Sequence, residues 1–279
     1  MSARSSARGS ETGRYLILGI CSIGVLFPVF WMMTTAIRPS SQLFSVPPRW
    51  IPSTITLDGF VNAWSNSPLP QYLVNSMFVV TASTVIAVAF SSFGAYGLSR
   101  FEFRGKGSFV TFLLVTQMFP AVMLLVPYFQ IISSVGLYNT YPALIVTYVA
   151  FSIPFCTWML WGYMQSIPKE LDDAAAMDGC TPFGTFWRVV LPLCLPGIIA
   201  TAIYSFITGW NEYIYALALM RSENMKTLPI GITALAGNDR LDWNALMATA
   251  VIAVIPMTII FIFFQRHLVS GLSAGAVKG

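Results

Sequence analysis

The chain has 279 residues, of which 56% are hydrophobic and only 9% are charged, and its formal net charge is +4. Soluble globular domains carry about 25% charged residues, so this composition excludes an ordinary water-soluble domain. We expect an integral membrane protein without a nucleic acid partner.

Six apolar segments are each long enough to cross the hydrocarbon core of a bilayer, which takes ~20 helical residues. They cover residues 15–37, 74–98, 108–132, 142–164, 193–219 and 244–264. The charge-rich stretches lie between and around them. The pattern predicts an all-α protein with a six-span domain at 15–264, in which Pro120, Pro127, Pro154 and Pro256 break or bend their helices.

The positions of Lys and Arg predict the orientation, because cytoplasmic loops are enriched in both residues. With the N-terminus in the cytoplasm, the inner segments hold ten of these residues and the outer segments hold five. Loop 99–107 carries three, whereas loop 133–141 carries none. We therefore expect both termini in the cytoplasm, as a disordered segment at 1–14 and a tail at 265–279. The first span runs on to Arg38 without a small-residue cleavage pattern, which favours an uncleaved span.

Two outer segments are longer than connectors need to be. Residues 38–73 contain six prolines, and within them Leu57, Phe60, Val61 and Trp64 recur at helical spacing, as expected of a short amphipathic helix at the membrane surface. Residues 221–243 mix charges with glycines. This outer loop is predicted to be a mobile contact loop, with an idle solvated loop as the alternative.

A polar segment at 166–192 separates the fourth and fifth apolar segments, and we expect it to form two short helices. In the first helix, Pro168 lies just inside the start and Ser166 is the expected cap. The second helix, capped by Thr181, runs to about Val190. The first turn of the first helix holds three carboxylates, which the positive end of the helix dipole favours: Glu170, Asp172 and Asp173.

Small side chains predict that one face of the first polar helix is nearly flat. Leu171, Ala174 and Ala175 share this face at i, i+3 and i+4 spacing, so another surface can approach closely. Gly179 is expected to end the helix in a left-handed turn. The pattern predicts a cytoplasmic docking element, with an ordinary amphipathic loop helix as the alternative.

Polar side chains are sparse inside the expected spans. Glu212 is the one ionisable carboxylate there, and a charge at mid-helix costs ~2.5–3.5 kcal/mol on insertion scales. Glu212 either lines a polar interior or anchors a kink near the outer surface. Asn75, Gln117, Gln130 and Asn211 are the other candidates for lining a translocation path, and hydrogen bonding between helices is the alternative for each.

No residue pattern indicates a cofactor or metal site. The four cysteines, Cys21, Cys156, Cys180 and Cys194, lack metal-ligand and redox spacing and are interpreted as small buried residues. The single histidine, His267, lies near a membrane exit. The phosphate-binding pattern Gly-x-x-x-x-Gly-Lys-Ser/Thr does not occur, so we do not expect this chain to hydrolyse ATP.

Two classes of function remain. The chain is either a pore-forming subunit driven by a separate ATPase, or a self-sufficient protein such as an ion-coupled secondary carrier or an intramembrane enzyme. Carriers usually contain internal repeats and buried ionisable groups, and this sequence has no evident repeat and one such group. An enzyme would need a constellation such as His-Glu-x-x-His, which is absent. The first class is favoured.

The segment 166–192 resembles the EAA loop of permease subunits of bacterial ABC importers. The resemblance rests on Asp173 followed by two alanines, on Gly179, and on the Val-x-Leu-Pro pattern at 189–192. Asp173 stands in place of the usual Glu, and Cys180 in place of the usual Ala. In that family this loop is the coupling helix that enters a cleft on the ATPase subunit.

Four further segments resemble the carbohydrate-uptake branch of these importers, and specifically a permease similar to the smaller, six-span one of the maltose transporter: 96–106, 117–120, 210–213 and 271–279. This resemblance implies a heterodimer with a second permease in the bacterial inner membrane, two ATPase subunits that bind ATP and Mg²⁺, and an extracytoplasmic solute-binding protein. It also implies that loop 221–243 reaches the binding protein and that the segment 271–279 lies along the ATPase interface. The residues it assigns to ATPase coupling are Leu171, Asp173, Ala174, Ala175, Asp178 and Gly179.

Overall fold

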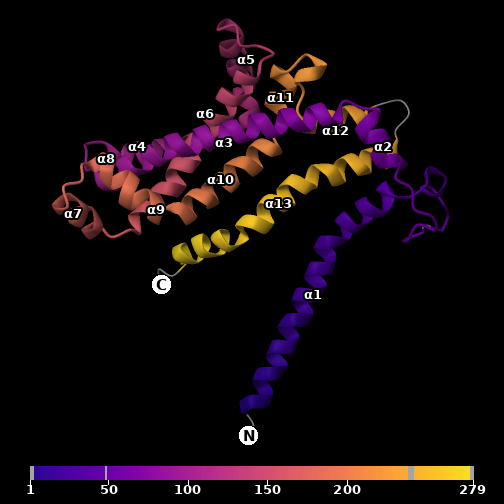
Figure 1. Ribbon diagram of the computed structural model, residues 1–279, viewed down its shortest axis with the longest axis horizontal. Coiled ribbons are helices and arrows are strands. Elements are labelled where there is room, and N and C mark those ends of the chain that lie inside the picture. The colour runs from indigo at the N-terminus through magenta and orange to yellow at the C-terminus, as the bar shows by residue number, and fades with distance from the viewer. Residues whose placement is uncertain (1–2, 48, 238–241, 277–279) are drawn as a thin grey trace. The chain divides into compact units, whose positions relative to one another are not determined.

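The structure is a computed structural model that describes residues 3–47, 49–237 and 242–276, with side chains described for 13–47, 49–237 and 242–265. The regular elements within these ranges are all helical, which confirms the all-α prediction (Figure 1). In chain order they are α1 (Ala3–Ala36), η1 (Ser40–Gln42), α2 (Asp58–Ser65), α3 (Leu69–Arg100), α4 (Lys106–Thr116), η2 (Ala121–Leu124), α5 (Leu125–Ser134), α6 (Tyr141–Gln165), α7 (Glu170–Met177), α8 (Pro182–Thr185), the π-helical turn η3 (Phe186–Val190), α9 (Leu191–Leu193), α10 (Leu195–Trp210), α11 (Ile214–Leu219), η4 (Glu223–Met225), α12 (Leu228–Ala236) and α13 (Trp243–Ala276).

Four helical segments are long and apolar enough to cross a membrane: Gly13–Ala36, Leu69–Arg100, Tyr141–Gln165 and Trp243–Gln265. Two further candidates are bent pairs of helices. The α4–α5 pair bends by 94° and the pair made of Pro182–Leu193 and α10 bends by 76°, so the predicted six spans are reached if each bent pair counts as one.

Prolines account for the bent pairs. Pro120 lies in the break between α4 and η2, where it lacks a donor N–H and disfavours helical geometry in the residue before it. Pro196 occupies the first turn of α10, directly after the second break. The bend at this break confirms the prediction that Pro120 breaks or bends its helix in the span at 108–132. Pro154 and Pro256, by contrast, lie inside helices that continue past them.

The described helices group into two compact units, which are considered separately. One unit contains residues 1–69 and 232–255, and the other contains residues 70–231 and 256–279.

The first unit is held together where α1 ends. Asn244, in the first turn of α13, donates hydrogen bonds to the carbonyl oxygens of Thr35 (2.8 Å) and Arg38 (2.6 Å). Helix α2 packs on this junction through Gly59. A β-carbon on Gly59 would lie 2.7 Å from the carbonyl oxygen of Ala36 and 2.9 Å from that of Asn244, so only glycine fits. This contact fixes the C-terminal end of α1.

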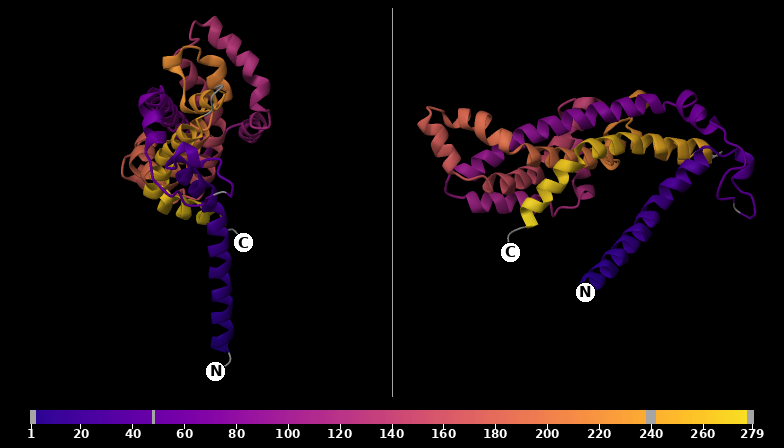
Figure 2. Two further views of the ribbon diagram at one scale, coloured as in Figure 1. Left: turned by 90° about the vertical axis from the view of Figure 1, so that its right-hand side faces the viewer. Right: turned by 60° about the horizontal axis from the view of Figure 1, so that its bottom comes forward.

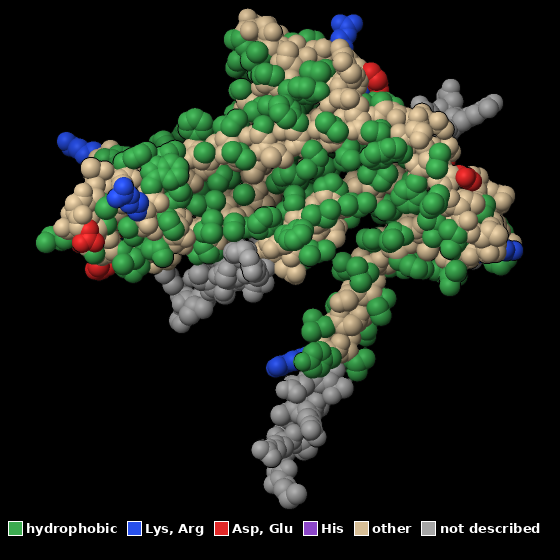
Figure 3. All heavy atoms as spheres, in the orientation of Figure 1, with side chains coloured by type: hydrophobic (Ala, Val, Ile, Leu, Met, Phe, Trp, Pro, Cys, Tyr) green, Lys and Arg blue, Asp and Glu red, His purple; other side chains and the backbone are tan. Residues whose placement is uncertain are grey.

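The second unit is built on the long helices α3, α6 and α10. A cluster of buried side chains joins the C-terminal end of α3 to α6 and to the turn η3: Ala95, Leu160, Met164, Ile167, Phe186, Val190 and Cys194. Helices α7 and α8 consequently lie beside the C-terminal end of α3 in each view (Figures 1 and 2). Apolar side chains cover most of the visible face of this unit, and charged side chains gather near α7 (Figure 3). This is the distribution expected of a membrane bundle with a polar end.

Three sequence predictions need correction or comment. Helix α1 begins at Ala3 and so overlaps the segment 1–14 that is predicted to be disordered. Among the four cysteines, Cys156 and Cys194 are buried, but Cys21 is exposed and Cys180 is half-buried. Helix α2 confirms the short helix expected near residues 57–64, and its apolar residues Val61 and Trp64 are exposed, as a membrane-surface helix requires.

Candidate functional site

The polar segment 166–192 folds into the predicted helix-turn-helix. Helix α7 carries Glu170, Asp172 and Asp173 in its first turn and ends before Gly179, whose φ is +81°. A side chain at this φ would be strained, so glycine is required for the turn. Thr181 then caps α8 by accepting a hydrogen bond from the backbone N–H of Gly184 at 3.2 Å.

The start of α7 differs from the prediction. Helix α7 begins at Glu170, so Pro168 lies before the helix, not inside it. Ser166 is not a cap, because its hydroxyl donates to the carbonyl oxygen of Tyr163 at the end of α6. The second helix starts at Pro182 as expected and then continues through η3 and α9 to Leu193.

The predicted flat face of α7 is divided between the protein interior and solvent. Ala175 is buried, whereas Ala174 is exposed and Leu171 is 39% exposed. The exposed surface is extended by Met177, which is 89% exposed and which the sequence pattern did not single out. Its position three residues after Ala174 on the same helix is the signal that could have identified it.

The residues assigned to coupling by resemblance therefore occupy one short element. Asp173, Asp178 and Gly179 are exposed on it together with Leu171 and Ala174. Ala175 is buried against the rest of this chain. The coupling role of these residues stays a prediction.

An ion pair attaches α7 to the end of α3. The Nε atom of Arg100 lies 2.8 Å from Oδ2 of Asp172, and the two side chains are only 6% and 20% exposed. Arg100 also donates from Nη1 to the carbonyl oxygen of Met164, at 3.1 Å. Breaking a buried ion pair by removing one partner costs about 3–5 kcal/mol, because the other charge is left uncompensated.

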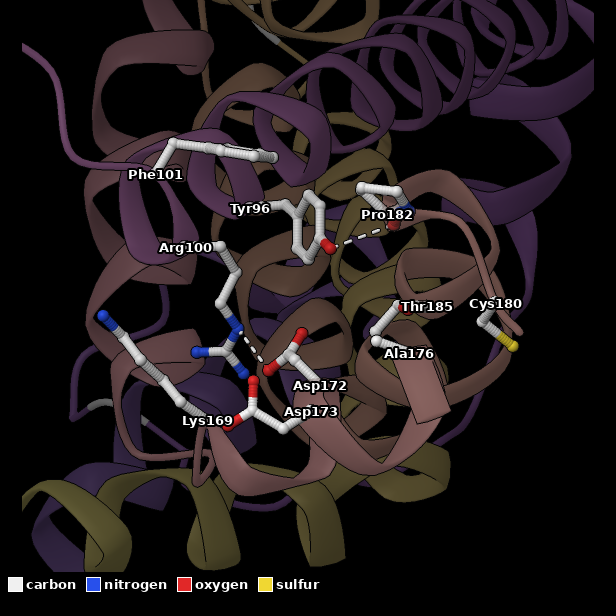
Figure 4. A pocket seen from close by; sticks show the side chains of 10 residues that line it. All are labelled: Tyr96, Arg100, Phe101, Lys169, Asp172, Asp173, Ala176, Cys180, Pro182 and Thr185. Atoms are coloured by element: carbon white, nitrogen blue, oxygen red, sulfur yellow. Dashed lines mark hydrogen bonds and ion pairs between the residues drawn. The ribbon is translucent and has the colours of Figure 1, made fainter. Parts of the chain in front are cut away.

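The same region contains a pocket of about 230 Å³ beside the ion pair (Figure 4). Tyr96 crosses it and donates to the carbonyl oxygen of Pro182 at 2.9 Å, which adds a second link between α3 and the helix-turn-helix. Lys169 and Asp173 line the pocket along with Arg100 and Asp172, so its walls carry both signs of charge. Because both signs of charge are present, we interpret these residues as holding α3 and α7 together, and not as a binding site for one charged solute.

Asn75, a candidate for the translocation path, is fully buried and its side chain is fully used in hydrogen bonds. Its Nδ2 donates to the carbonyl oxygens of Asn224 (2.9 Å) and Lys226 (2.7 Å). Its Oδ1 accepts from Gln71 (2.8 Å) and from the hydroxyl of Tyr141 (2.7 Å). This is the arrangement that the alternative of interhelical hydrogen bonding predicts.

These bonds hold the first half of the outer loop on the N-terminal part of α3. Ser76 accepts from the backbone N–H of Leu228 at 2.8 Å, and Tyr72 donates to Glu223. Hydrogen bonds from Lys226 and then Tyr72 hold the pKa of Glu223 below its usual value. We call residues 221–228 the outer strap.

Asn139 fixes the other side of the outer strap. Its Oδ1 accepts from the backbone N–H groups of Arg221 (2.8 Å) and Ser222 (2.9 Å). In the part of the predicted contact loop at 221–228 the hydrogen bonds are many and partly buried, so this part is held on its neighbouring helices. Residues 238–241 of the same loop lie outside the described residues.

Glu212 anchors the break between α10 and α11. Its carboxylate accepts hydrogen bonds from the backbone N–H groups of Tyr215 (2.8 Å) and Ala216 (3.0 Å) and so caps the start of α11. It also accepts a hydrogen bond from the hydroxyl of Tyr148 (2.8 Å). Capping carboxylates are favoured by the positive end of a helix. This is the geometry that the kink-anchor alternative predicts.

The remaining path candidates lie at exposed positions. Gln117 is exposed at the end of α4, and Asn211 is exposed at the end of α10, where its Nδ2 donates to the carbonyl oxygen of Ile207 at 2.8 Å. Asn75 and Glu212 each bond to a tyrosine of α6, Tyr141 and Tyr148, which lie seven residues apart on one helix face. Gln130, in α5, is exposed as well, and the path assignment of all five residues stays a prediction.

Replacing Glu212 by alanine should lower both stability and transport. The change removes two capping bonds and leaves the buried Tyr148 hydroxyl unpaired, for a cost of about 1–3 kcal/mol. Glu212→Gln keeps acceptor oxygen at this position and should be closer to wild type. Thermal unfolding in detergent and solute uptake are the measurements, and the anchor interpretation fails if Gln is as damaging as Ala.

The fold and the site together define a helical membrane protein with a shaped polar helix-turn-helix outside its spans. Residues 87–274 match the family model of the binding-protein-dependent transport system inner membrane component. The chain therefore belongs to this family and is a permease subunit of an ABC importer.

Two relatives match nearly the whole chain. The sulfoquinovosyl glycerol transport system permease protein SmoH of Agrobacterium fabrum is 35% identical over 95% of this chain and 93% of its own. The trehalose/maltose transport system permease protein MalG of Thermococcus litoralis is 36% identical over 95% of this chain and 96% of its own. The fold is also similar to one chain of a bacterial ABC transporter that imports the acidic polysaccharide alginate, with a TM-score of 0.78 and 23% identity over 94% of this chain and 97% of that chain.

Proposed function

We propose that this permease serves the uptake of a carbohydrate or a related glycoside. The two relatives at 35–36% identity are named for the transport of sulfoquinovosyl glycerol and of trehalose and maltose, which all contain glycosidic bonds. Each match covers nearly all of this chain and of the relative. This supports a substrate class shared with these relatives, and not only a shared fold. The particular solute would be chosen by the binding protein that delivers it.

The subunit is proposed to work as half of a permease pair. A second, homologous permease would complete the translocation path, and an extracytoplasmic solute-binding protein would deliver the solute to the outer face. Two ATPase subunits would bind ATP and Mg²⁺ and perform the hydrolysis, because this sequence lacks a phosphate-binding loop. The excess of Lys and Arg in the inner segments supports a cytoplasmic location for both termini and for α7.

The observation that carries this proposal is the exposed surface of α7 beside the glycine turn. An apolar surface that includes Leu171 and Met177 is not expected on a solvated loop unless a partner covers it. Its small residue, Ala174, leaves room for close approach. We infer that this surface enters the ATPase, and that ATP-driven movement of α7 alternates access to the path between the permeases.

Reconstitution in proteoliposomes with the second permease and the ATPase subunits tests this function. Uptake of the solute bound by the cognate binding protein should require both that protein and internal ATP. An imposed proton or sodium gradient without ATP should give no uptake. Uptake driven by the gradient alone would instead support an ion-coupled carrier.

A ligand screen on the binding protein tests the substrate class separately. We expect a mono-, di- or oligosaccharide, or a glycoside, to raise its thermal unfolding temperature, because a bound ligand stabilises the folded state. Stabilisation by amino acids or metal ions alone would contradict the carbohydrate assignment and leave the importer assignment intact.

A further inference from the structure

Helix α3 is fixed at both ends by polar contacts. Near its start it holds the outer strap through Tyr72, Asn75 and Ser76. At its last residue it holds α7 through the ion pair of Arg100 with Asp172. The 25 residues between Asn75 and Arg100 form an unbroken helix roughly 37 Å long at 1.5 Å per residue.

Arg100 connects three elements at one point. Its Nε pairs with Asp172 of α7, while its Nη1 donates to the carbonyl oxygen of Met164 near the end of α6. Along the chain, α7 is joined to α6 through residues 166–169 and to α8 through residues 178–181, but not to α3. Arg100 thus provides the charged link by which a movement of α7 reaches α3 (Figure 4).

The burial of this ion pair distinguishes it from an ordinary surface pair. Glu102, in the loop after α3, and Lys106, the first residue of α4, lie at the same distance of 2.8 Å, but Glu102 is 75% exposed. Exposed pairs are worth little because water and salt screen them, whereas a buried charge without its partner is strongly penalised. Among the described residues, neither Nε and Nη2 of Arg100 nor the two carboxylate oxygens of Asp172 have a hydrogen-bond partner, so each charge depends on the other for compensation.

We propose that Arg100 and Asp172 are positioning residues that couple α7 to α3, so that movement imposed on α7 by the ATPase is transmitted along α3 to the outer strap. This inference rests on the proposed function. The pair acts through helix position and does not contact solute or nucleotide. Tyr96 lies one turn before Arg100 on α3, and its hydrogen bond to the carbonyl oxygen of Pro182 supports the same junction.

The test uses the reconstituted complex with single and paired substitutions. Asp172→Asn removes one charge at nearly constant size, and Arg100→Gln removes the other charge with a shorter polar side chain. Arg100→Asp combined with Asp172→Arg restores an opposite-charge pair in reversed order. Glu102→Gln removes the matched exposed pair and serves as the control. Each complex is assayed for retained ATPase subunits, basal ATP hydrolysis, stimulation of hydrolysis by loaded binding protein, and uptake.

We expect the single variants to retain the ATPase subunits and basal hydrolysis. Binding-protein stimulation and uptake should fall about tenfold, within the roughly 5- to 150-fold range of typical couplings between sites. The reversed pair should recover a large part of both, since the two residues interact directly. The control should behave as wild type.

Three results would overturn the inference. Wild-type stimulation and uptake in both single variants would show that the pair transmits nothing. Loss of the ATPase subunits in the single variants would show that the pair only maintains the docking surface. A reversed pair no better than the single variants would show that the charges do not act together. Failure of the wild-type complex to transport would refute the proposed function instead.

Discussion

Replacing Gly179 by valine should abolish solute uptake while the protein still inserts in the membrane. Gly179 has φ +81°, where a β-carbon clashes with its own backbone at a cost of roughly 1–2 kcal/mol, and a β-branched side chain fits worst. The turn would open and move α7 away from α8. Because α7 is the proposed contact with the ATPase, ATP-dependent uptake and retention of the ATPase subunits are the measurements.

Two companion variants separate the effect of the turn from general strain. Gly105 also has a positive φ, +93°, and like Gly179 has open space around it, but it precedes α4 and not the docking element. Gly105→Val should therefore leave uptake much closer to wild type. Gly179→Asn should restore activity in part, because asparagine tolerates this conformation better than valine. Equal uptake by Gly179→Val and wild type would remove the coupling assignment.

Replacing Asn75 by leucine should release the outer strap from α3. The change removes four hydrogen bonds and leaves buried partners unpaired, which we expect to cost about 2–4 kcal/mol. The unfolding temperature in detergent should fall, and stimulation of ATP hydrolysis by loaded binding protein should weaken. Basal hydrolysis should persist, because α7 lies at the other end of α3.

Asn211→Leu provides the matched control, since Asn211 is exposed and makes a single local side-chain bond. It should change the unfolding temperature little. A different pattern would follow if Asn75 contacted solute. In that case Asn75→Leu would alter the apparent affinity or choice of solute at unchanged stability, and the strap interpretation would be wrong.

The polar element 166–192 could be predicted in detail because its signals are local. Carboxylates in a first turn, a glycine that ends a helix and a capping threonine each act within a few residues, and Gly179 and Thr181 take the expected roles. The errors at Ser166 and Pro168 are shifts of two or three residues at a helix start. Ala175 was misplaced for a different reason, since periodicity places it on a face but does not say which neighbour covers that face.

The candidate path residues illustrate the limits of sequence more clearly. A polar residue in an apolar segment can face a path or bond to another helix, and the choice depends on partners far away in the chain. Asn75 bonds to residues near 224, and Glu212 bonds to Tyr148, so these contacts exist only after the helices assemble. The sequence identifies polar residues in apolar segments, but it does not show which distant residues are their hydrogen-bond partners.

By itself, the sequence determined the membrane class, the helical architecture and the docking element, because hydrophobic length and local capping depend on neighbouring residues alone. Only the tertiary structure decided how sharply the α4–α5 segment bends, that residues 221–228 are hydrogen-bonded to α3, and that Arg100 meets Asp172 across 72 positions of sequence. These features depend on which distant groups supply the hydrogen bonds and counter-charges that buried polar atoms require.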